Sequence, residues 1–279
     1  MRKILLSALI ASVCVIASPI AAAHLTTAQG RALSREAAAG NAQALTALQQ
    51  DARRGDGIAQ FALGVLYDFG RGVPQNYRNA AQSYRKAAEQ GNAGAWNNLG
   101  VLYEMGRGVP RNYAKALKWF RKAAQQGDAN AQNSLGFMYV KGRDVPQNYA
   151  EAVQWFRKSA GQGHAKAQFN LGIMYAKGRG VSQNYAEAVQ WLSKAAEKGY
   201  ANAQNSLGFM YAKGRGVPQN YVEAYRWIAL SKVTSNPSGG AYRTASQNLR
   251  YLATRMSPTQ IAQAQQEVAE WVVKHPRAQ

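Results

Sequence analysis

The sequence predicts an all-α fold in which short helical hairpins are stacked into an α-solenoid. The motif Leu-Gly-x-x-Tyr occurs five times at intervals of 36 residues, with copies beginning at Leu63, Leu99, Leu135, Leu171 and Leu207. Each unit holds two stretches with the apolar spacing of an amphipathic helix, and Gly and Pro residues separate them. A constant period of about 20–50 residues is typical of stacked supersecondary units.

The first helix of a unit is clearest in the third copy. Four residues there follow the spacing i, i+4, i+7 and i+8, namely Ala131, Leu135, Met138 and Tyr139. This spacing places them on one side of a helix. Gly142 follows directly as a stop signal. The pattern therefore predicts a helix with one buried stripe that ends before Gly142.

The second helix of the same unit is predicted to begin at Asn148. The Asn148 side chain can cap the helix, and Glu151 stands three residues later, where it would complete a capping box. The same pair begins at Asn184 and Asn220. The buried stripe is predicted to contain Ala152, Trp155, Phe156 and Ala160. Gly163 stands where a left-handed residue would end the helix.

A glycine recurs inside each first helix, at positions 64, 100, 136, 172 and 208. Glycine in a helix interior costs about 1 kcal/mol relative to alanine. Close approach of the two helices would offset that cost. We therefore expect each glycine to face a small residue of the second helix, at Ala80, Ala116, Ala152, Ala188 or Ala224.

Together these positions resemble the Sel1-like repeat, a relative of the tetratricopeptide repeat. The matching residues in the third copy are Ala131, Leu135, Gly136, Tyr139, Gly142, Val145, Ala152, Trp155, Ala160 and Gly163. The resemblance covers roughly residues 56–235 and implies α-hairpins wound into a right-handed superhelix. Three local departures are Asn at the start of each second helix where the family usually has Asp, Ser83-Tyr84 where the first copy lacks the tryptophan, and Asp144 in place of a loop glycine.

The N-terminal segment 1–23 has the pattern of a secretory signal. Arg2 and Lys3 precede an apolar run at 4–16, and small residues lead up to Ala23. The run is too short to span a bilayer, so we expect cleavage after Ala23 and a periplasmic or secreted product. A retained membrane anchor is the alternative. A lipoprotein would need a lipobox at Cys14, which the preceding valine does not suit.

Helical caps are expected at both ends of the repeats. Residues 24–55 are predicted to begin as a mobile tail and to continue into an N-terminal cap, which consists of a helix at 44–55, aligned with the second helix of a repeat, and part of 27–40. A linker and two further helices are predicted in 236–279, with Ser257-Pro258 starting the last one. The five repeats between the caps are assigned to 56–91, 92–127, 128–163, 164–199 and 200–235.

The sequence gives no constellation that would support catalysis or hold a cofactor or metal. Beyond residue 23 the histidines are His24, His164 and His275, which are far apart in the chain, and no cysteine remains. Neither a Gly-x-Ser-x-Gly nor a His-Glu-x-x-His motif occurs. The resemblance also raises the alternative of a β-lactamase activity, which is claimed for cysteine-rich relatives, but this chain lacks their cysteines. We therefore predict a protein that is not an enzyme.

Charge points instead to binding. The chain has a net charge of +20, which loss of Arg2 and Lys3 would reduce to +18. Basic residues recur in the turn inside each repeat, beginning with Arg71 in the first. Those of the second to fifth repeats form a predicted binding row, here called the loop ladder, made of Arg107, Lys141, Arg143, Lys177, Arg179, Lys213 and Arg215. Its successive members should lie about 10 Å apart. A second basic row near the ends of the second helices, such as Arg121-Lys122, is explained by the helix dipole.

A second candidate surface is a set of asparagines on the first helices: Asn97, Asn133, Asn170 and Asn205. They lie off the apolar stripe, where we expect a concave, ligand-binding face. Asparagine is a poor helix former, so its recurrence there needs a reason. The tyrosines and tryptophans, by contrast, recur at the period of the fold and are assigned to the core.

The resemblance implies a protein–protein scaffold or adaptor in the bacterial cell envelope, with a regulatory or virulence-related role. The expected partner is an acidic protein bound by a monomer. The alternative is a binder of an anionic polysaccharide, a membrane surface or nucleic acid through the basic surface, although nucleic acid is not expected after export. Salt dependence of binding separates these alternatives.

Overall fold

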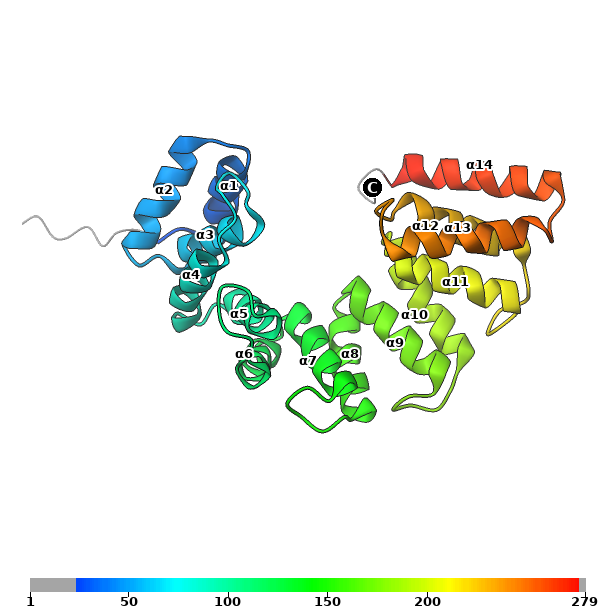
Figure 1. The fold of residues 1–279 in the computed structure, drawn as a ribbon, viewed down its shortest axis with the longest axis horizontal. Helices are drawn as coiled ribbons and strands as arrows, with labels where there is room; N and C mark the ends of the chain where they lie inside the picture. The colour runs from blue at the N-terminus through cyan, green and yellow to red at the C-terminus, as the bar shows by residue number, and fades with distance from the viewer. Residues whose placement is uncertain (1–23, 276–279) are drawn as a thin grey trace, which may run out of the picture.

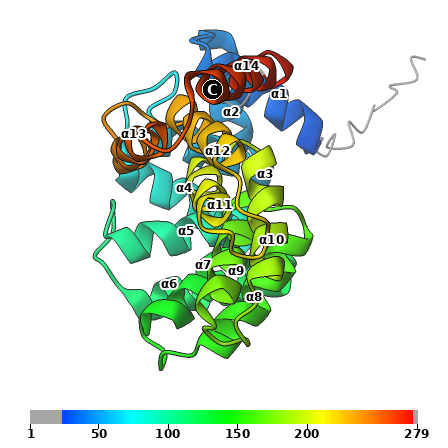
Figure 2. The same ribbon diagram turned by 90° about the vertical axis from the view of Figure 1, so that its right-hand side faces the viewer.

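The computed structural model describes residues 24–275; the predicted export signal at 1–23 and residues 276–279 lie outside the described part. Within the described part the chain forms fourteen helices and no strand, which confirms the all-α solenoid (Figure 1). The helices form an arch with α2 and α14 near its two ends (Figure 1), and Figure 2 views the arch from the C-terminal arm. No helix of this part combines the length and apolarity needed to cross a membrane.

From α1 to α12 the helices alternate between first and second helices of successive hairpins. Their bounds are α1 Thr27–Ala38, α2 Ala42–Arg53, α3 Gly57–Phe69, α4 Tyr77–Glu89, α5 Ala93–Met105, α6 Tyr113–Gln125, α7 Ala129–Lys141, α8 Tyr149–Gly161, α9 Ala165–Lys177, α10 Tyr185–Glu197, α11 Ala201–Lys213, α12 Tyr221–Val233, α13 Gly240–Ala253 and α14 Pro258–Lys274. Each helix packs against the next one along the chain as far as α13, and α14 packs on α12. The buried residues of the described part accordingly form a succession of clusters along the solenoid.

The asparagine caps of the second helices are confirmed, but the predicted capping boxes are wrong. The Asn148 side chain accepts a hydrogen bond from the Glu151 backbone N–H at 3.0 Å. The Asn148 backbone N–H, which the Glu151 side chain was expected to bind, donates instead to the Tyr139 carbonyl at 3.1 Å. The same backbone bond links Asn to the motif tyrosine in all five repeats. It ties the second helix to the first and leaves no donor for a capping box.

The helix glycines do mark close helix approach, but their neighbours differ from the prediction. A Cβ atom added to Gly136 would lie 2.7 Å from the Phe156 ring and 3.2 Å from the Ala152 carbonyl oxygen. In the other repeats the nearest groups are Tyr84, Phe120, Leu192 and Ile228. The expected alanine lies one turn earlier, so the glycine accommodates a large side chain rather than a small one.

The N-terminal cap is a complete hairpin and not a tail followed by one helix. α1 begins at Thr26, whose side chain and that of Gln29 form a reciprocal capping box. The Leu25 N–H donates to the Asp56 carboxylate at 2.6 Å, which fixes the segment before α1 to the start of α3. These contacts explain why 27–38 forms a helix. At the other end, α14 begins with the predicted Ser257 cap and Pro258.

His164 caps α9 in a way that makes stability depend on pH. Its Nδ1 accepts from the Ala167 N–H at 3.2 Å, and its Nε2 lies 3.0 Å from the Asn130 side-chain oxygen. Burial, together with the charge of Lys166, lowers the pKa of His164 below its ordinary value of 6.5. An imidazolium would also lose the acceptor that caps the helix. The capped state is therefore favoured above pH 6.5 and loses stability as the pH falls through the lowered pKa.

We expect His164→Asn to remove part of this pH dependence. Asn92 already caps α5 at the equivalent position, so the substitution keeps the cap without a titrating group. Thermal unfolding from pH 7.5 to 5 should show a steeper loss of Tm for the parent than for His164→Asn. If Tm fell equally with pH in both proteins, His164 would have the same pKa in the folded and the unfolded chain.

Candidate binding surface

The arginines of the loop ladder lie on tyrosines of the preceding repeat. Each guanidinium carbon is 5.1–5.4 Å from the centre of a ring, in the pairs Arg107–Tyr77, Arg143–Tyr113, Arg179–Tyr149 and Arg215–Tyr185. These tyrosines are the first residues of the second helices. A cation over an exposed ring contributes about 0.5–1 kcal/mol. The ladder arginines therefore link successive repeats.

One member of the loop ladder is engaged further. Arg143 is half-buried and forms an ion pair with Glu104 of α5 at 2.5 Å. It therefore contacts both helices of the preceding repeat. A binding role for the ladder arginines stays a prediction, and because of these contacts we expect their removal to lower the melting temperature as well.

The second basic row also contacts tyrosines, in this case on the following repeat. The guanidinium groups of Arg85, Arg121 and Arg157 donate to the hydroxyls of Tyr103, Tyr139 and Tyr175 at 3.1, 3.5 and 2.9 Å. Complementing the helix dipole is thus only part of their role. Together the two rows hold each repeat to both of its neighbours through tyrosine.

The asparagines are less exposed than the predicted ligand-binding face requires. Asn97 and Asn133 are only 8% and 5% exposed. Asn170 donates to Asn133 at 2.9 Å, and Asn248 of α13 donates to Asn205 at 3.0 Å. Successive first helices lie next to each other at this position, so their amides pair across the interface. The prediction of a solvent-facing row is therefore wrong for Asn97 and Asn133.

The other regularly placed polar groups also join repeats, and the sequence analysis did not identify them. Side-chain nitrogens of Gln60, Trp96, Gln132, Gln168 and Gln204 donate to the last-turn alanine carbonyl of the preceding second helix. The distances are 2.9–3.3 Å. Glutamine at four of five equivalent positions was the available signal, since a buried amide needs a fixed partner.

One groove brings together members of both predicted site sets. It has a volume of about 380 Å³ and lies between α9, α11 and α13, close to the turn after α11. Its lining residues are Ile173, Ala176, Lys177, Tyr185, Leu192, Asn205, Ser206, Phe209, Met210, Arg215, Thr244 and Asn248. Of the predicted site residues it contains Lys177, Asn205 and Arg215. Arg107, Lys141, Arg143, Lys213, Asn97, Asn133 and Asn170 do not line this groove.

The groove combines basic and apolar side chains. Lys177 is exposed, and Arg215 lies 5.6 Å from the ring of Phe209. Phe209 is 43% exposed despite its size. No acidic residue occurs among the described residues that line the groove. This chemistry suits a partner segment with an apolar side chain beside a carboxylate. In sequence the feature is visible only as Asn205 and Phe209, which stand four residues apart on one predicted helix.

Residues 24–275 offer no cluster of three or more histidine, cysteine, aspartate or glutamate side chains that could hold a metal ion. The largest pKa shift belongs to Tyr84, whose pKa rises because its hydroxyl is buried and lies near the Asp68 carboxylate, 3.1 Å away. That tyrosine packs beneath Gly64 in the core. Its shift therefore reflects packing of the hairpin.

The repeats of this chain match a known family model. The family model described as Sel1 repeat matches five segments, at residues 57–92, 95–128, 129–164, 165–200 and 201–231. A search of curated proteins gave no significant match. Among solved structures, the chain is similar to a Sel1 repeat protein from Oxalobacter formigenes. The two are 39% identical, with a TM-score of 0.64, over 76% of this chain and 86% of that one.

Two further solved structures are similar at lower identity. One is c5321, a protective antigen present in uropathogenic Escherichia coli strains; it is 28% identical with a TM-score of 0.55, over 91% of this chain and 62% of that one. The other is a Sel1 repeat protein from Klebsiella pneumoniae, 21% identical with a TM-score of 0.50, over 75% of this chain and 99% of that one. The last similarity concerns the fold alone.

Proposed function

This chain belongs to the Sel1 repeat family, and from that membership we propose that it is a non-enzymatic scaffold or adaptor of the bacterial cell envelope. Sel1 repeat proteins are generally protein-interaction scaffolds. The contacts described above tie each repeat to its neighbours and present the outer side chains on a continuous frame. A solenoid of this kind binds through an extended surface.

The groove between α9, α11 and α13 carries the proposal that the partner is an acidic protein segment. Phe209 supplies an exposed aromatic anchor, and Lys177 and Arg215 supply positive charge in the same groove. Aromatic and arginine side chains contribute most to the binding energy of protein interfaces. Basic groups around them select acidic partners and raise the association rate.

Export rests on the pattern of residues 1–23, where a short apolar run follows two basic residues. The proposal places the remainder of the chain in the periplasm or outside the cell as a monomer. Similarity to a protective antigen of uropathogenic Escherichia coli supports a virulence-related role.

The test uses the protein without residues 1–23 as bait in an envelope extract. A captured acidic protein is then titrated against the parent, Phe209→Ser and Phe69→Ser. We expect Phe209→Ser to bind about tenfold more weakly, since loss of an aromatic anchor costs more than about 1 kcal/mol. Phe69 is the matched control, because it is 59% exposed, lies beside Arg71 and is outside the groove.

Equal affinities for Phe209→Ser and Phe69→Ser would show that the groove does not contact the captured protein. The exposed ladder lysines Lys141, Lys177 and Lys213, with the asparagine pairs, would then be examined in turn. Lys177→Gln removes a charge from the groove, and Lys166→Gln removes one from the same helix outside it. Comparing their affinities for the captured protein distinguishes an effect of the groove charge from an effect of the net charge.

Binding of an anionic polymer is the second candidate, favoured by the net charge of +20. Counterion release makes such binding fall steeply with salt, by about 10³–10⁵ between 50 and 200 mM for six to ten phosphate contacts on DNA. Heparin and anionic lipid vesicles are suitable probes. A steep loss for the parent, unchanged by Phe209→Ser, would favour the polymer over a protein partner.

A further inference from the structure

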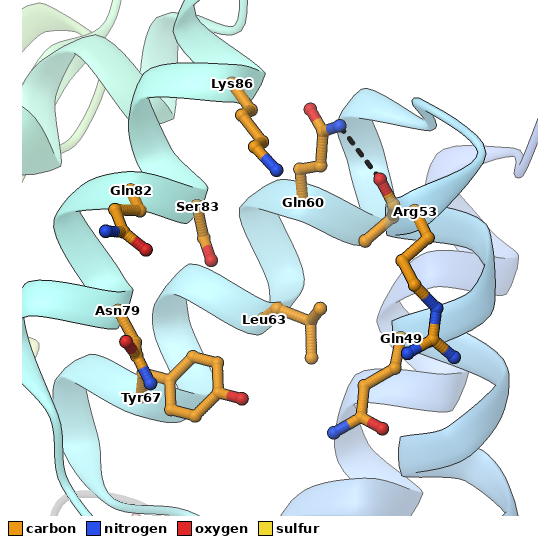
Figure 3. Close-up of a pocket in the computed structure, with 10 residues that line it drawn as sticks. Gln49, Arg53, Gln60, Leu63, Tyr67, Asn79, Gln82, Ser83 and Lys86 are labelled. Carbon is orange, nitrogen blue, oxygen red and sulfur yellow. Dashed lines mark hydrogen bonds between the residues drawn. The ribbon is translucent and has the colours of Figure 1, made fainter.

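The second helix of the first repeat lacks the tryptophan that the other four repeats carry. Ser83 stands where they have Trp119, Trp155, Trp191 and Trp227. At this position the structure has an open pocket of about 320 Å³ between α2 and α4, with α3 as its floor (Figure 3). Figure 3 shows Ser83 and Lys86 of α4 facing Gln49 and Arg53 of α2 across the pocket.

The chain itself shows which group fills the equivalent space in other repeats. Trp155, Trp191 and Trp227 each pack in a core cluster that includes residues of the hairpin before their own. Trp227 is only 6% exposed. An indole ring at this position is therefore ordinarily part of the packing between successive hairpins. At Ser83 the space stays open, and Leu63 and Tyr67 of α3 line its floor.

A lysine three residues after the tryptophan contacts the indole in three repeats. The ammonium nitrogens of Lys122, Lys158 and Lys194 lie 5.3, 4.3 and 4.4 Å from the ring centres of Trp119, Trp155 and Trp191. Lys86 is the counterpart of these lysines in the first repeat. Because Ser83 replaces the tryptophan, Lys86 lacks the indole that its counterparts contact, and it points into the pocket (Figure 3).

A second substitution widens the site. Gln49 occupies the position at which Arg85, Arg121 and Arg157 donate to a tyrosine hydroxyl of the next repeat. The shorter glutamine leaves the edge of Tyr67 facing the pocket. Arg53 and Lys86 give the rim positive charge, and no acidic residue is found among the described residues that line it.

We infer that this pocket, here called the Ser83 pocket, binds a tryptophan side chain from an acidic segment of a partner protein. The indole would take the place that Trp119 and its counterparts hold in their own repeats, with Lys86 over the ring. Carboxylates beside the tryptophan would pair with Arg53 at the rim. A cation over a tryptophan face is the most favourable of the aromatic cation contacts. The Ser83 pocket lies in the N-terminal arm and is separate from the groove beside α13.

The probe is the peptide acetyl-Asp-Trp-Glu-amide, and acetyl-Asp-Ala-Glu-amide is its control. Binding is measured by chemical-shift titration of the protein without residues 1–23. We expect saturable binding of the tryptophan peptide to the parent and to Ser83→Ala, which keeps the pocket open. Ser83→Trp should fill the pocket with its own indole and weaken binding at least tenfold. Phe209→Ser should bind the probe like the parent, which keeps this test independent of the proposed groove.

Three results would overturn the inference: no saturable shift for the parent at millimolar peptide, equal affinity for Ser83→Trp, or equal binding of the alanine peptide. Ser83→Trp should fold, because four repeats carry this residue, and its Tm should equal or exceed that of the parent. If its Tm falls instead, Lys86→Gln decides the question. That variant leaves the pocket open. It should weaken binding of the tryptophan peptide two- to fivefold and leave the response to the alanine peptide unchanged.

Discussion

Gly136→Leu is expected to destabilise the solenoid by about 1–3 kcal/mol or more, because it inserts a side chain into a filled helix contact. Even a single Cβ at this position would lie 2.7 Å from the Phe156 ring. Phe156 is 1% exposed and is packed in a cluster of buried side chains. Chemical denaturation followed by circular dichroism measures the loss.

Gly161→Leu is the matched control for this prediction. Gly161 ends α8, and a Cβ added there meets no atom within 4 Å. Because leucine is the better helix former, this variant should be neutral or more stable by up to about 1 kcal/mol. If Gly136→Leu were as stable as Gly161→Leu, the register of α7 on α8 would have to be different.

The period and the helix boundaries could be predicted from the sequence because they depend on local signals. The motif at Leu135 fixes the repeat length, Asn148 begins a helix through its own side chain, and Gly142 ends one with a positive φ of 63°. Each signal acts within a few residues of itself. The hairpin at the N-terminus was missed in part, because α1 is alanine-rich and is held by contacts with α3.

The roles of the polar and charged side chains could not be predicted in the same way. Arg107 and Asn133 have the same period as a surface row would have, but their partners lie in another repeat. Which residues meet across a repeat interface depends on the angle between hairpins. A period alone does not contain that angle. The groove beside α13 could not be predicted for the same reason, because one of its lining residues, Asn248, belongs to a helix outside the repeats.

These contacts bear on binding as well as on stability. Arg179 contacts Tyr149 of the preceding repeat, and Arg157 contacts Tyr175 of the following one. These contacts hold the surface side chains of neighbouring repeats at a fixed distance from each other before any partner binds. A partner then meets side chains that are already ordered, which reduces the entropy lost on association. Substituting ladder arginines will change stability and affinity together. The lysines and Phe209 are therefore the better probes of binding.

The loop glycines have an equally large expected effect, and the third repeat provides a natural comparison. Gly180 has a φ of 71°, and a Cβ there would lie 2.3 Å from the Tyr149 carbonyl carbon of the preceding repeat. Gly180→Val meets both problems, because a β-branched residue is strongly disfavoured at positive φ and the obstructing atoms belong to the backbone. Asp144 stands at the same place with a φ of 57°. Aspartate tolerates this conformation better than most residues other than glycine do.

Gly180→Val should therefore cost at least about 2 kcal/mol, whereas Asp144→Gly should stabilise the protein by up to about 1 kcal/mol because it removes the unfavourable left-handed residue. Both substitutions alter the same turn in adjacent repeats. The decisive result is therefore that they change the free energy of unfolding in opposite directions. Hydrogen exchange on the second helices will locate the effect. Faster exchange in α8 and α10 is expected for Gly180→Val, because the turn joins these two repeats. Unchanged exchange in both helices would show that the turn does not hold the repeats together.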